Sequence, residues 1–126
     1  MFVDEYLSAL ESSDQTAVLR LFTEGAVVHS PLYGTMPAAD FYPLLFEDTA
    51  ESRLRLRSVL TGEHNGASAT AFWFDFDWVL ADGTPAPFTV VDIAELNAEG
   101  LITTLHIVYD TATVRPLFEK SASSPA

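Results

Sequence analysis

One carboxyl group interrupts an otherwise apolar row of residues. The stretch 88–97 alternates between two faces in the manner of a β-strand, and Asp92 falls on the apolar face between Val90 and Ala94. Burying an ionised carboxylate without a partner is costly, so such a group either pairs or becomes neutral with a raised pKa. A perturbed, buried acid in a cavity is a candidate functional group. The periodicity fits equally well with a structural role, in which Asp92 bonds to nearby backbone or to an arginine.

Two tyrosines are further candidates for chemistry. Tyr6 lies on the apolar stripe of a predicted first helix, and Tyr42 stands next to Phe41 in a predicted third helix. A buried tyrosine hydroxyl needs a hydrogen-bond partner. Taken alone, each is interpreted as a core tyrosine and not as a catalytic one.

The sequence offers no pattern typical of a metal or cofactor site. The histidines His29, His64 and His106 do not cluster at ligand spacing, and the chain has no cysteine, so no metal site is predicted. No glycine-rich phosphate loop is present, and we expect no nucleotide or other cofactor.

The first fifty residues show mainly the period of helices. An amphipathic helix is predicted around residues 3–10, and a second begins after Asp14, which can cap it. The second helix is expected to carry Val18, Leu21 and Phe22 on one face and to end near Gly25. A short strand at 26–29 follows. A third helix is expected to start near Pro37 and to bury Phe41, Leu44 and Leu45.

From Ser52 onward the period changes to that of strands. In the predicted strand around residues 72–78, the residues on one face are all aromatic, namely Phe72, Phe74, Phe76 and Trp78. Trp73, Asp75 and Asp77 fall on the other face. Further strands are predicted at about 88–97 and 101–110. This order predicts an α+β fold with helices over one face of the sheet. We expect a single domain spanning residues 1–126, with a mobile tail from about residue 117.

Composition narrows the range of partners. The chain carries 18 acidic against 6 basic residues, a formal net charge of -12, which disfavours nucleic acid and anionic membranes as partners. The first residues lack the basic start and apolar run of a signal peptide, and no stretch is long enough to span a bilayer. We therefore expect a cytoplasmic protein.

Several segments resemble the bacterial ketosteroid isomerases. They are Tyr6-Leu7, the run from Leu21 to Pro31, Phe41-Tyr42, Leu60-Thr61-Gly62, His64-Asn65-Gly66 and Val90-Val91-Asp92-Ile93. The resemblance covers roughly residues 3 to 110 in the same order. It implies membership of the nuclear transport factor 2-like superfamily, which also contains SnoaL-like polyketide cyclases and limonene epoxide hydrolases. The implied fold is a cone, with three N-terminal helices packed on a strongly curved antiparallel sheet.

The resemblance also implies roles for individual residues. Tyr6 and Asp92 look like the pair that forms the oxyanion hole of the isomerases, and Tyr42 looks like the tyrosine that supports Tyr6. Ser30 stands where the isomerases carry their general base, an aspartate, so ordinary isomerisation should be weak. Tyr109 looks like the replacement of a tryptophan near that base. The Arg-x-Asp pair of the epoxide hydrolases is missing.

Three hypotheses for function follow. The first is an enzyme that stabilises an enol or enolate of a steroid-like or polyketide-like ketone, as an isomerase or a cyclase. The second is a non-catalytic protein that binds a small hydrophobic ligand, and the third is a structural domain with a filled core. Family members commonly dimerise, and the apolar outer residues Trp73, Val91, Ile93 and Val108 predict a homodimer. The residues expected to line a ligand pocket are Phe22, Phe72, Phe74, Phe76, Trp78, Phe88, Val90, Leu105, Ile107 and Tyr109.

Overall fold

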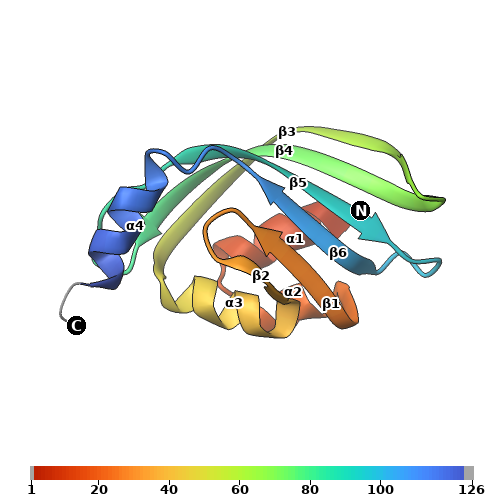
Figure 1. Cartoon of the computed structure of the whole chain (residues 1–126), viewed down its shortest axis with the longest axis horizontal. Coiled ribbons are helices and arrows are strands. Elements are labelled where there is room, and N and C mark those ends of the chain that lie inside the picture. The colour runs from red at the N-terminus through yellow and green to blue at the C-terminus, as the bar shows by residue number, and fades with distance from the viewer. Residues whose placement is uncertain (1, 124–126) are drawn as a thin grey trace.

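A computed structural model describes residues 2–123 of the chain as four helices and one sheet of six strands (Figure 1). In chain order the elements are α1 (Phe2–Glu11), α2 (Gln15–Leu19), β1 (Phe22–Ser30), β2 (Gly34–Pro37), α3 (Ala38–Glu47), β3 (Thr49–His64), β4 (Ala67–Leu80), β5 (Phe88–Leu96), β6 (Ile102–Val108) and α4 (Val114–Ala122).

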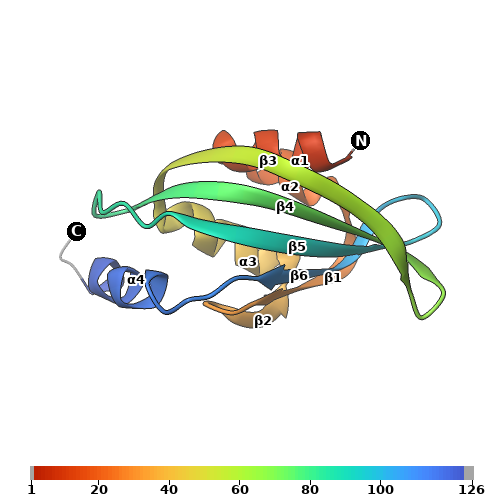
Figure 2. The ribbon, with the colours of Figure 1, turned by 90° about the horizontal axis from the view of Figure 1, so that it is seen from above.

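The sheet has the strand order β2-β1-β6-β5-β4-β3 and is strongly curved (Figures 1 and 2). Helices α1 to α3 lie against its concave face, which confirms the predicted α+β class with three N-terminal helices on a bent sheet. One pair departs from the antiparallel arrangement, because β1 runs parallel to β6. The other neighbouring strands are antiparallel. The chain passes from β1 through β2, α3 and three further strands before β6 returns beside β1.

The concave face of the sheet carries the core. The predicted aromatic row of β4 faces the helices and is buried throughout, which confirms the register from the sequence. Trp73 and Asp75 point to the convex face, as expected. The tight turn between β3 and β4 lies at Asn65 and Gly66, whose φ angles are positive (51° and 80°).

The second helix is shorter than predicted. Asp14 caps it through a hydrogen bond from the Ala17 amide, but the helix ends at Leu19 and Phe22 already belongs to β1. The Leu21 carbonyl accepts a 2.9 Å hydrogen bond from the Ile102 amide, so the chain joins the sheet at this point. Gly25, at φ 79°, is not a helix cap but lies where the β1–β6 register shifts.

The third helix begins after Pro37 as predicted, but it buries a different set of residues. Phe41, Tyr42 and Leu45 are buried, whereas Leu44 is 42% exposed. The spacing from Phe41 to Leu45 is one helical turn, so these two side chains share the face toward the sheet, and Leu44 is rotated off that face.

The C-terminal segment corrects the expectation of a mobile tail from about residue 117. Residues 114–122 form α4, and the Phe118 ring lies 5.3 Å from the Tyr33 ring and 6.0 Å from the Trp78 ring. Arg115 of the same helix donates a 2.6 Å hydrogen bond to the Pro31 carbonyl. The part of the expectation that concerns residues 124–126 falls outside the described residues.

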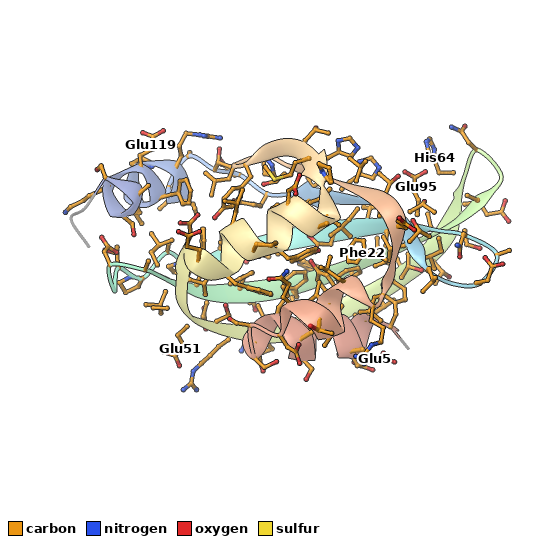
Figure 3. All side chains as sticks on the ribbon, turned by 90° about the horizontal axis from the view of Figure 1, so that it is seen from below. Glu5, Phe22, Glu51, His64, Glu95 and Glu119 are labelled. Atoms are coloured by element: carbon orange, nitrogen blue, oxygen red, sulfur yellow. The ribbon has the colours of Figure 1, made fainter. Side chains whose placement is uncertain are left out.

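Acidic side chains surround this core. Figure 3 shows Glu5, Glu51, Glu95 and Glu119 at the periphery and Phe22 in the interior. No helix within residues 2–123 is both long and apolar enough to cross a membrane.

Candidate functional site

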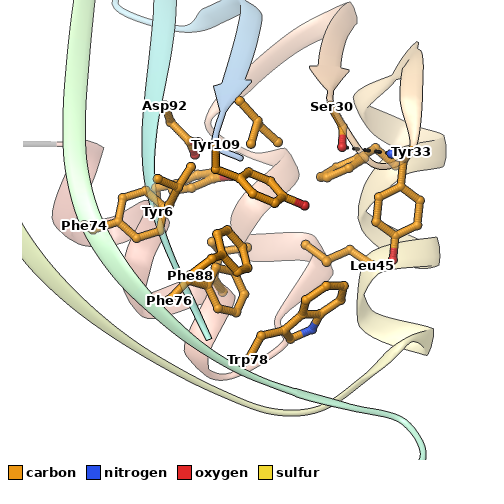
Figure 4. Close-up of a pocket in the computed structure, with 14 residues that line it drawn as sticks. Tyr6, Ser30, Tyr33, Leu45, Phe74, Phe76, Trp78, Phe88, Asp92 and Tyr109 are labelled. Atoms are coloured by element: carbon orange, nitrogen blue, oxygen red, sulfur yellow. Dashed lines mark hydrogen bonds between the residues drawn. The ribbon is translucent and has the colours of Figure 1, made fainter. Parts of the chain in front are cut away.

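A cavity lies between the concave face of the sheet and the helices (Figure 4). About 40 Å³ of it is open to the centre of a water molecule, which is room for a few waters at most. Its walls are mainly aromatic, and its polar groups come from Asp92, Ser30 and three tyrosines. The lining residues are Tyr6, Leu10, Ser30, Tyr33, Phe41, Leu45, Phe74, Phe76, Trp78, Phe88, Val90, Asp92, Ile107 and Tyr109.

Asp92 lies in the middle of β5, on the face that turns toward the helices. It is only 2% exposed, and its Oδ1 atom has no hydrogen-bond partner among residues 2–123. Burial raises the pKa of this carboxyl group well above its ordinary value, and the nearby Tyr6 hydroxyl opposes the rise only in part. Asp92 is therefore a buried acid that favours its neutral form. The predicted arginine partner of the structural interpretation is absent from the described residues.

Tyr6 approaches the same region from α1. Its hydroxyl shares a 2.8 Å hydrogen bond with the Tyr42 hydroxyl of α3, and both side chains are almost fully buried. Burial is the main reason that the pKa of Tyr6 lies well above its ordinary value, and the neighbouring Tyr42 and Asp92 raise it further. Tyr6 lines the cavity and Tyr42 does not, so Tyr42 positions the Tyr6 hydroxyl from behind.

Ser30 ends β1 at the opposite side of the cavity. Its Oγ atom accepts a hydrogen bond from the Leu32 amide at 3.1 Å. It accepts a second from the Tyr33 amide at 3.0 Å (Figure 4). Two amide donors on one hydroxyl oxygen make it a poorer proton acceptor, because they withdraw electron density from the lone pairs. Ser30 holds the turn that places Tyr33 at the cavity, and its own O–H remains able to donate.

Two further tyrosines complete the lining. The Tyr33 hydroxyl donates a 2.7 Å hydrogen bond to Asp48 Oδ2. Burial is the main reason that the pKa of Tyr33 is raised, and the hydrogen bond to Asp48 raises it further. Tyr109 follows the last residue of β6, and burial raises the pKa of its hydroxyl to about 12. Its ring stacks on that of Phe88 with the centroids 4.1 Å apart.

The structure brings most of the predicted site residues together. Seven of the ten expected pocket residues line the cavity, and so do Tyr6, Asp92 and Ser30. The other three, Phe22, Phe72 and Leu105, are buried in the core outside the lining. They face inward as expected, but they are packed within the core: the Tyr6 ring of α1 lies 6.5 Å from the Phe22 ring and 5.5 Å from the Phe72 ring.

Four lining residues were not expected, namely Leu10, Tyr33, Phe41 and Leu45. Three of them lie on the apolar stripes of predicted helices, so their burial could be predicted but their place at a cavity could not. Tyr33 stands in a short irregular segment that shows no periodicity. The sequence does hold a signal for it, because a serine followed by a proline is typical of a turn, and here the Ser30 hydroxyl accepts from the Leu32 and Tyr33 amides beyond Pro31.

The prediction that the histidines do not cluster is wrong for two of them. His29 and His106 are partners across the parallel β1–β6 pair, and their rings stack with centroids 4.9 Å apart. His106 Nε2 lies 2.9 Å from Glu95 Oε2, and His29 Nδ1 lies 2.9 Å from Thr35 Oγ1. Nevertheless, within residues 2–123 no three histidine, aspartate or glutamate side chains are arranged to hold a metal ion.

Comparison with known families agrees with this arrangement. Residues 3–105 match the SnoaL-like domain family over most of the chain. The chain belongs to this family. No match was found among curated proteins.

Solved structures share the fold of this SnoaL-like domain. An NTF2-like protein of unknown function from Burkholderia pseudomallei is 20% identical, with a TM-score of 0.75 over 92% of this chain and 93% of that one. A protein with a ketosteroid isomerase-like fold from Catenulispora acidiphila, in complex with trimethylamine, is 12% identical, with a TM-score of 0.75 over 98% and 96%. A candidate polyketide cyclase from Pseudomonas putida is 16% identical, with a TM-score of 0.63 over 90% and 92%. At these identities the likeness establishes the NTF2-like fold.

The cavity of this SnoaL-like domain has a defined chemical range. Its walls are apolar, and the Tyr6 hydroxyl and the neutral Asp92 carboxyl can offer two hydrogen-bond donors to one oxygen. Donors held in an apolar site stabilise developing negative charge much better than water does. Among the lining residues, Asp92 is the only one with a carboxyl group, and none is a histidine. The lining therefore offers no other side chain that could act as a general base.

Proposed function

We propose that this SnoaL-like domain is a ketosteroid isomerase-like enzyme that stabilises the enolate of a small apolar ketone of steroid-like or polyketide-like type. The observation that carries the proposal is Asp92, which lines an aromatic cavity and has one buried oxygen, near the Tyr6 hydroxyl, with no hydrogen-bond partner in the part of the chain that the structure describes. A buried polar atom without a partner costs about 1–3 kcal/mol. A ligand oxygen that bonds to Asp92 would recover part of this cost.

The proposed chemistry is removal of a proton from the carbon beside a carbonyl group. The C–H bond breaks, and its electron pair moves into the carbonyl, so that negative charge develops on the oxygen. Tyr6 and neutral Asp92 donate hydrogen bonds to that oxygen. Tyr42 keeps the Tyr6 hydroxyl in place. The proton goes to a basic group on the substrate, because Ser30 is engaged by two amides and Asp92 acts as a donor.

A second candidate function is binding without chemistry. The hydrogen bonds of Ser30 favour this function. Ser30 stands where the isomerases carry their aspartate base, and because its oxygen already accepts two amide hydrogen bonds it is a weak base. In that case the cavity holds a small hydrophobic molecule, with Asp92 and Tyr6 providing selectivity for an oxygen atom.

A binding series tests the donor pair. Naphthol and methylnaphthalene have nearly the same shape, so their affinity ratio measures the contribution of the oxygen. We expect the wild type to prefer naphthol by about tenfold or more, as two hydrogen bonds to one oxygen imply. Tryptophan fluorescence reports binding, because Trp78 lines the cavity.

Three variants sharpen this test. Asp92→Ala and Tyr6→Phe each remove a donor and should reduce the preference for naphthol. Asp92→Asn is the matched control, since its amide can still donate and should retain most of the preference. An unchanged preference in all three variants would exclude the oxyanion-hole assignment. Loss of stability without any change in preference would favour the structural interpretation.

The choice between catalysis and binding depends on turnover. We expect very low activity of the wild type on a β,γ-unsaturated ketosteroid, and a gain of roughly 10²-fold or more in Ser30→Asp, which supplies a general base. The Leu32 and Tyr33 amides would hold the new carboxylate in place, but they would also lower its pKa and limit the gain. Ser30→Asn is the control, because it is similar in shape and cannot accept the proton.

We further propose that the convex face of the sheet forms a homodimer. Trp73 is 39% exposed and Val108 is 55% exposed on this face, and the Arg57 guanidinium lies 5.0 Å from the centre of the Trp73 ring. Because each chain carries a net charge of -12, association should strengthen with salt. A sedimentation mass of one chain at micromolar concentration and moderate salt would contradict the dimer, and Val108→Glu should convert the dimer to monomers.

A further inference from the structure

The cavity is too small for the ligands that its chemistry suits. Its open space of about 40 Å³ takes water but no aromatic ring, and pockets for small organic ligands usually measure about 300–1,000 Å³. At least one lining side chain must therefore leave before a ligand can enter. The question is which of the side chains is free to move.

Most of the aromatic lining is held in place by its surroundings. Phe74, Phe76 and Trp78 project from the middle and end of β4 and are almost fully buried. The Trp78 indole also donates a 2.8 Å hydrogen bond to Thr49 Oγ1. Phe41 is equally buried on α3. Moving any of these would open the core itself.

The four tyrosines of the chain differ in how they are anchored. Tyr6 and Tyr42 bond to each other at 2.8 Å, and Tyr33 donates to Asp48 at 2.7 Å. The Tyr109 hydroxyl makes no hydrogen bond to any of residues 2–123, although its ring reaches into the cavity. Tyr109 is also half-buried, so one side of it already faces solvent.

The backbone at Tyr109 is free of the sheet as well. The last paired residue of β6 is Val108, opposite Val91, and Tyr109 begins the irregular stretch before α4. A backbone shift at Tyr109 that carries its ring outward therefore breaks no ladder hydrogen bond. Figure 4 shows the ring lying across the cavity, between Asp92 on one side and Ser30 and Tyr33 on the other.

The Tyr109 ring belongs to a stack of aromatic rings that forms one wall of the cavity. It stacks on Phe88 with centroids 4.1 Å apart and planes at 26°, and Phe88 stacks in turn on Phe76 at 5.1 Å and 20°. A flat ligand in the place of Tyr109 would continue this stack. Stacked aromatic pairs contribute beyond their buried area, so the exchange of one ring for another costs little.

We infer that Tyr109 is the specificity-determining residue of the cavity: its ring occupies the ligand's place on Phe88, and a ligand enters by displacing it. Of the two ligand types proposed above, this placement favours the polyketide-like one, a flat aromatic or conjugated molecule of one or two rings, over a steroid-like one with a bulky saturated skeleton. The orientation of the ligand, with its oxygen toward Tyr6 and Asp92, rests on the proposed function. The exchange of the Tyr109 ring for a ligand ring on Phe88 does not depend on it.

The test uses naphthalene, which has no oxygen and so does not depend on the oxyanion hole. Tyr109→Ala should bind naphthalene about tenfold more tightly than the wild type, because no ring has to be displaced. Tyr109→Phe should bind within about twofold of the wild type, since it keeps the stacked ring and loses an unbonded hydroxyl. Tyr33→Ala is the matched control: it removes an anchored tyrosine of the same cavity and should lose stability without this gain.

A second measurement covers the case in which Tyr109→Ala does not fold. Naphthalene should increase the nitration of Tyr109 by tetranitromethane in the wild type, as mapped by mass spectrometry, because the displaced ring enters solvent. Protection of Tyr109 by naphthalene, or equal naphthalene affinity of the wild type and a folded Tyr109→Ala, would overturn the inference. So would a gain in Tyr33→Ala that equals the gain in Tyr109→Ala.

The two proposals can fail separately. If naphthalene displaces Tyr109 but naphthol is not preferred over methylnaphthalene, the inference about Tyr109 stands and the oxyanion hole fails. If naphthol is preferred in every protein but Tyr109→Ala gains nothing, the oxyanion hole stands and the inference about Tyr109 fails.

Discussion

Asp75 and Asp92 lie on opposite faces of the same sheet and are held in opposite states. Asp75 accepts hydrogen bonds from the Arg55 and Arg57 guanidinium groups and from the Thr89 hydroxyl, and these donors lower its pKa. Asp92 faces aromatic rings, and burial raises its pKa. The two residues sit on adjacent strands, so residue type and strand position do not decide protonation. The protonation of each carboxyl group depends on the groups that surround it on its face of the sheet.

The two faces also respond to pH in opposite directions. The folded-state pKa of Asp75 lies below its unfolded value, so its contribution to stability is present above about pH 4 and is lost as the pH falls through the lowered pKa. The folded-state pKa of Asp92 lies above its unfolded value. Its contribution is therefore fully present below about pH 4 and is lost as the pH rises through the raised pKa.

The largest expected effect comes from Asp92→Asn, which cannot ionise. Relative to this variant, the wild type should lose about 1.4 kcal/mol of unfolding free energy per pH unit above pH 4, until the pKa of Asp92 is reached. Denaturant unfolding of both proteins from pH 4 to pH 9 measures the difference. If the unfolding free energies of the two proteins changed in parallel over that range, Asp92 would not be held neutral. The contrast between Asp92 and Asp75 would then be wrong.

An intermediate effect is expected from the tyrosine pair beside Asp92. Tyr6→Phe leaves the buried Tyr42 hydroxyl without its partner and should cost about 1–3 kcal/mol of unfolding free energy. Tyr42→Phe should cost less, because the freed Tyr6 hydroxyl lies close to Asp92 and can donate to it. Unfolding titrations at pH 6 compare the two variants. If both variants lost the same unfolding free energy, the Tyr6 hydroxyl could not reach Asp92. The two groups could then not donate to one oxygen in the arrangement proposed for the oxyanion hole.

The smallest expected effect belongs to the convex face. Asp75→Asn removes the acceptor of Arg55 and Arg57, but both guanidinium groups reach water, so the melting temperature at pH 7 should fall only slightly. The deficit should shrink as the pH falls below 4, because the Asp75 carboxylate of the unfolded wild type then takes up a proton while the folded one is still ionised, and it should also shrink with added salt. A large deficit that is independent of salt would mean that Asp75 is held as rigidly as a buried group.

Much of the inward face could be predicted because side-chain alternation is a local property of a strand. The alternation placed Asp92 among Val90 and Ala94, and all three are buried in the structure. The aromatic row of β4 is confirmed for the same reason. Where local patterns competed, the prediction failed: Val18 and Phe22 fit one helical face, but pairing with β6 draws Phe22 into β1.

Helix α4 shows a signal that was present and missed. Val114, Leu117 and Phe118 stand at i, i+3 and i+4, the spacing of one helical face, and each packs in or against the core. Pro116 lies among these residues and the segment ends in small polar residues, which is why the sequence favoured a mobile tail. Its helix is stabilised by contacts with Tyr33 and Trp78, which lie far away in the sequence.

The sequence by itself determined which side chains of the long strands face inward, and that an acid stands among them, because side chains alternate between the two faces of a strand. Only the tertiary structure decided which inward residues meet. The register of β1 on β6, the approach of α1 and α3 to β5, and the position of Tyr109 on Phe88 depend on packing between distant segments. That packing brings Tyr6 close to Asp92, stacks His29 on His106, and leaves a cavity of about 40 Å³ where the pattern alone implied an open pocket.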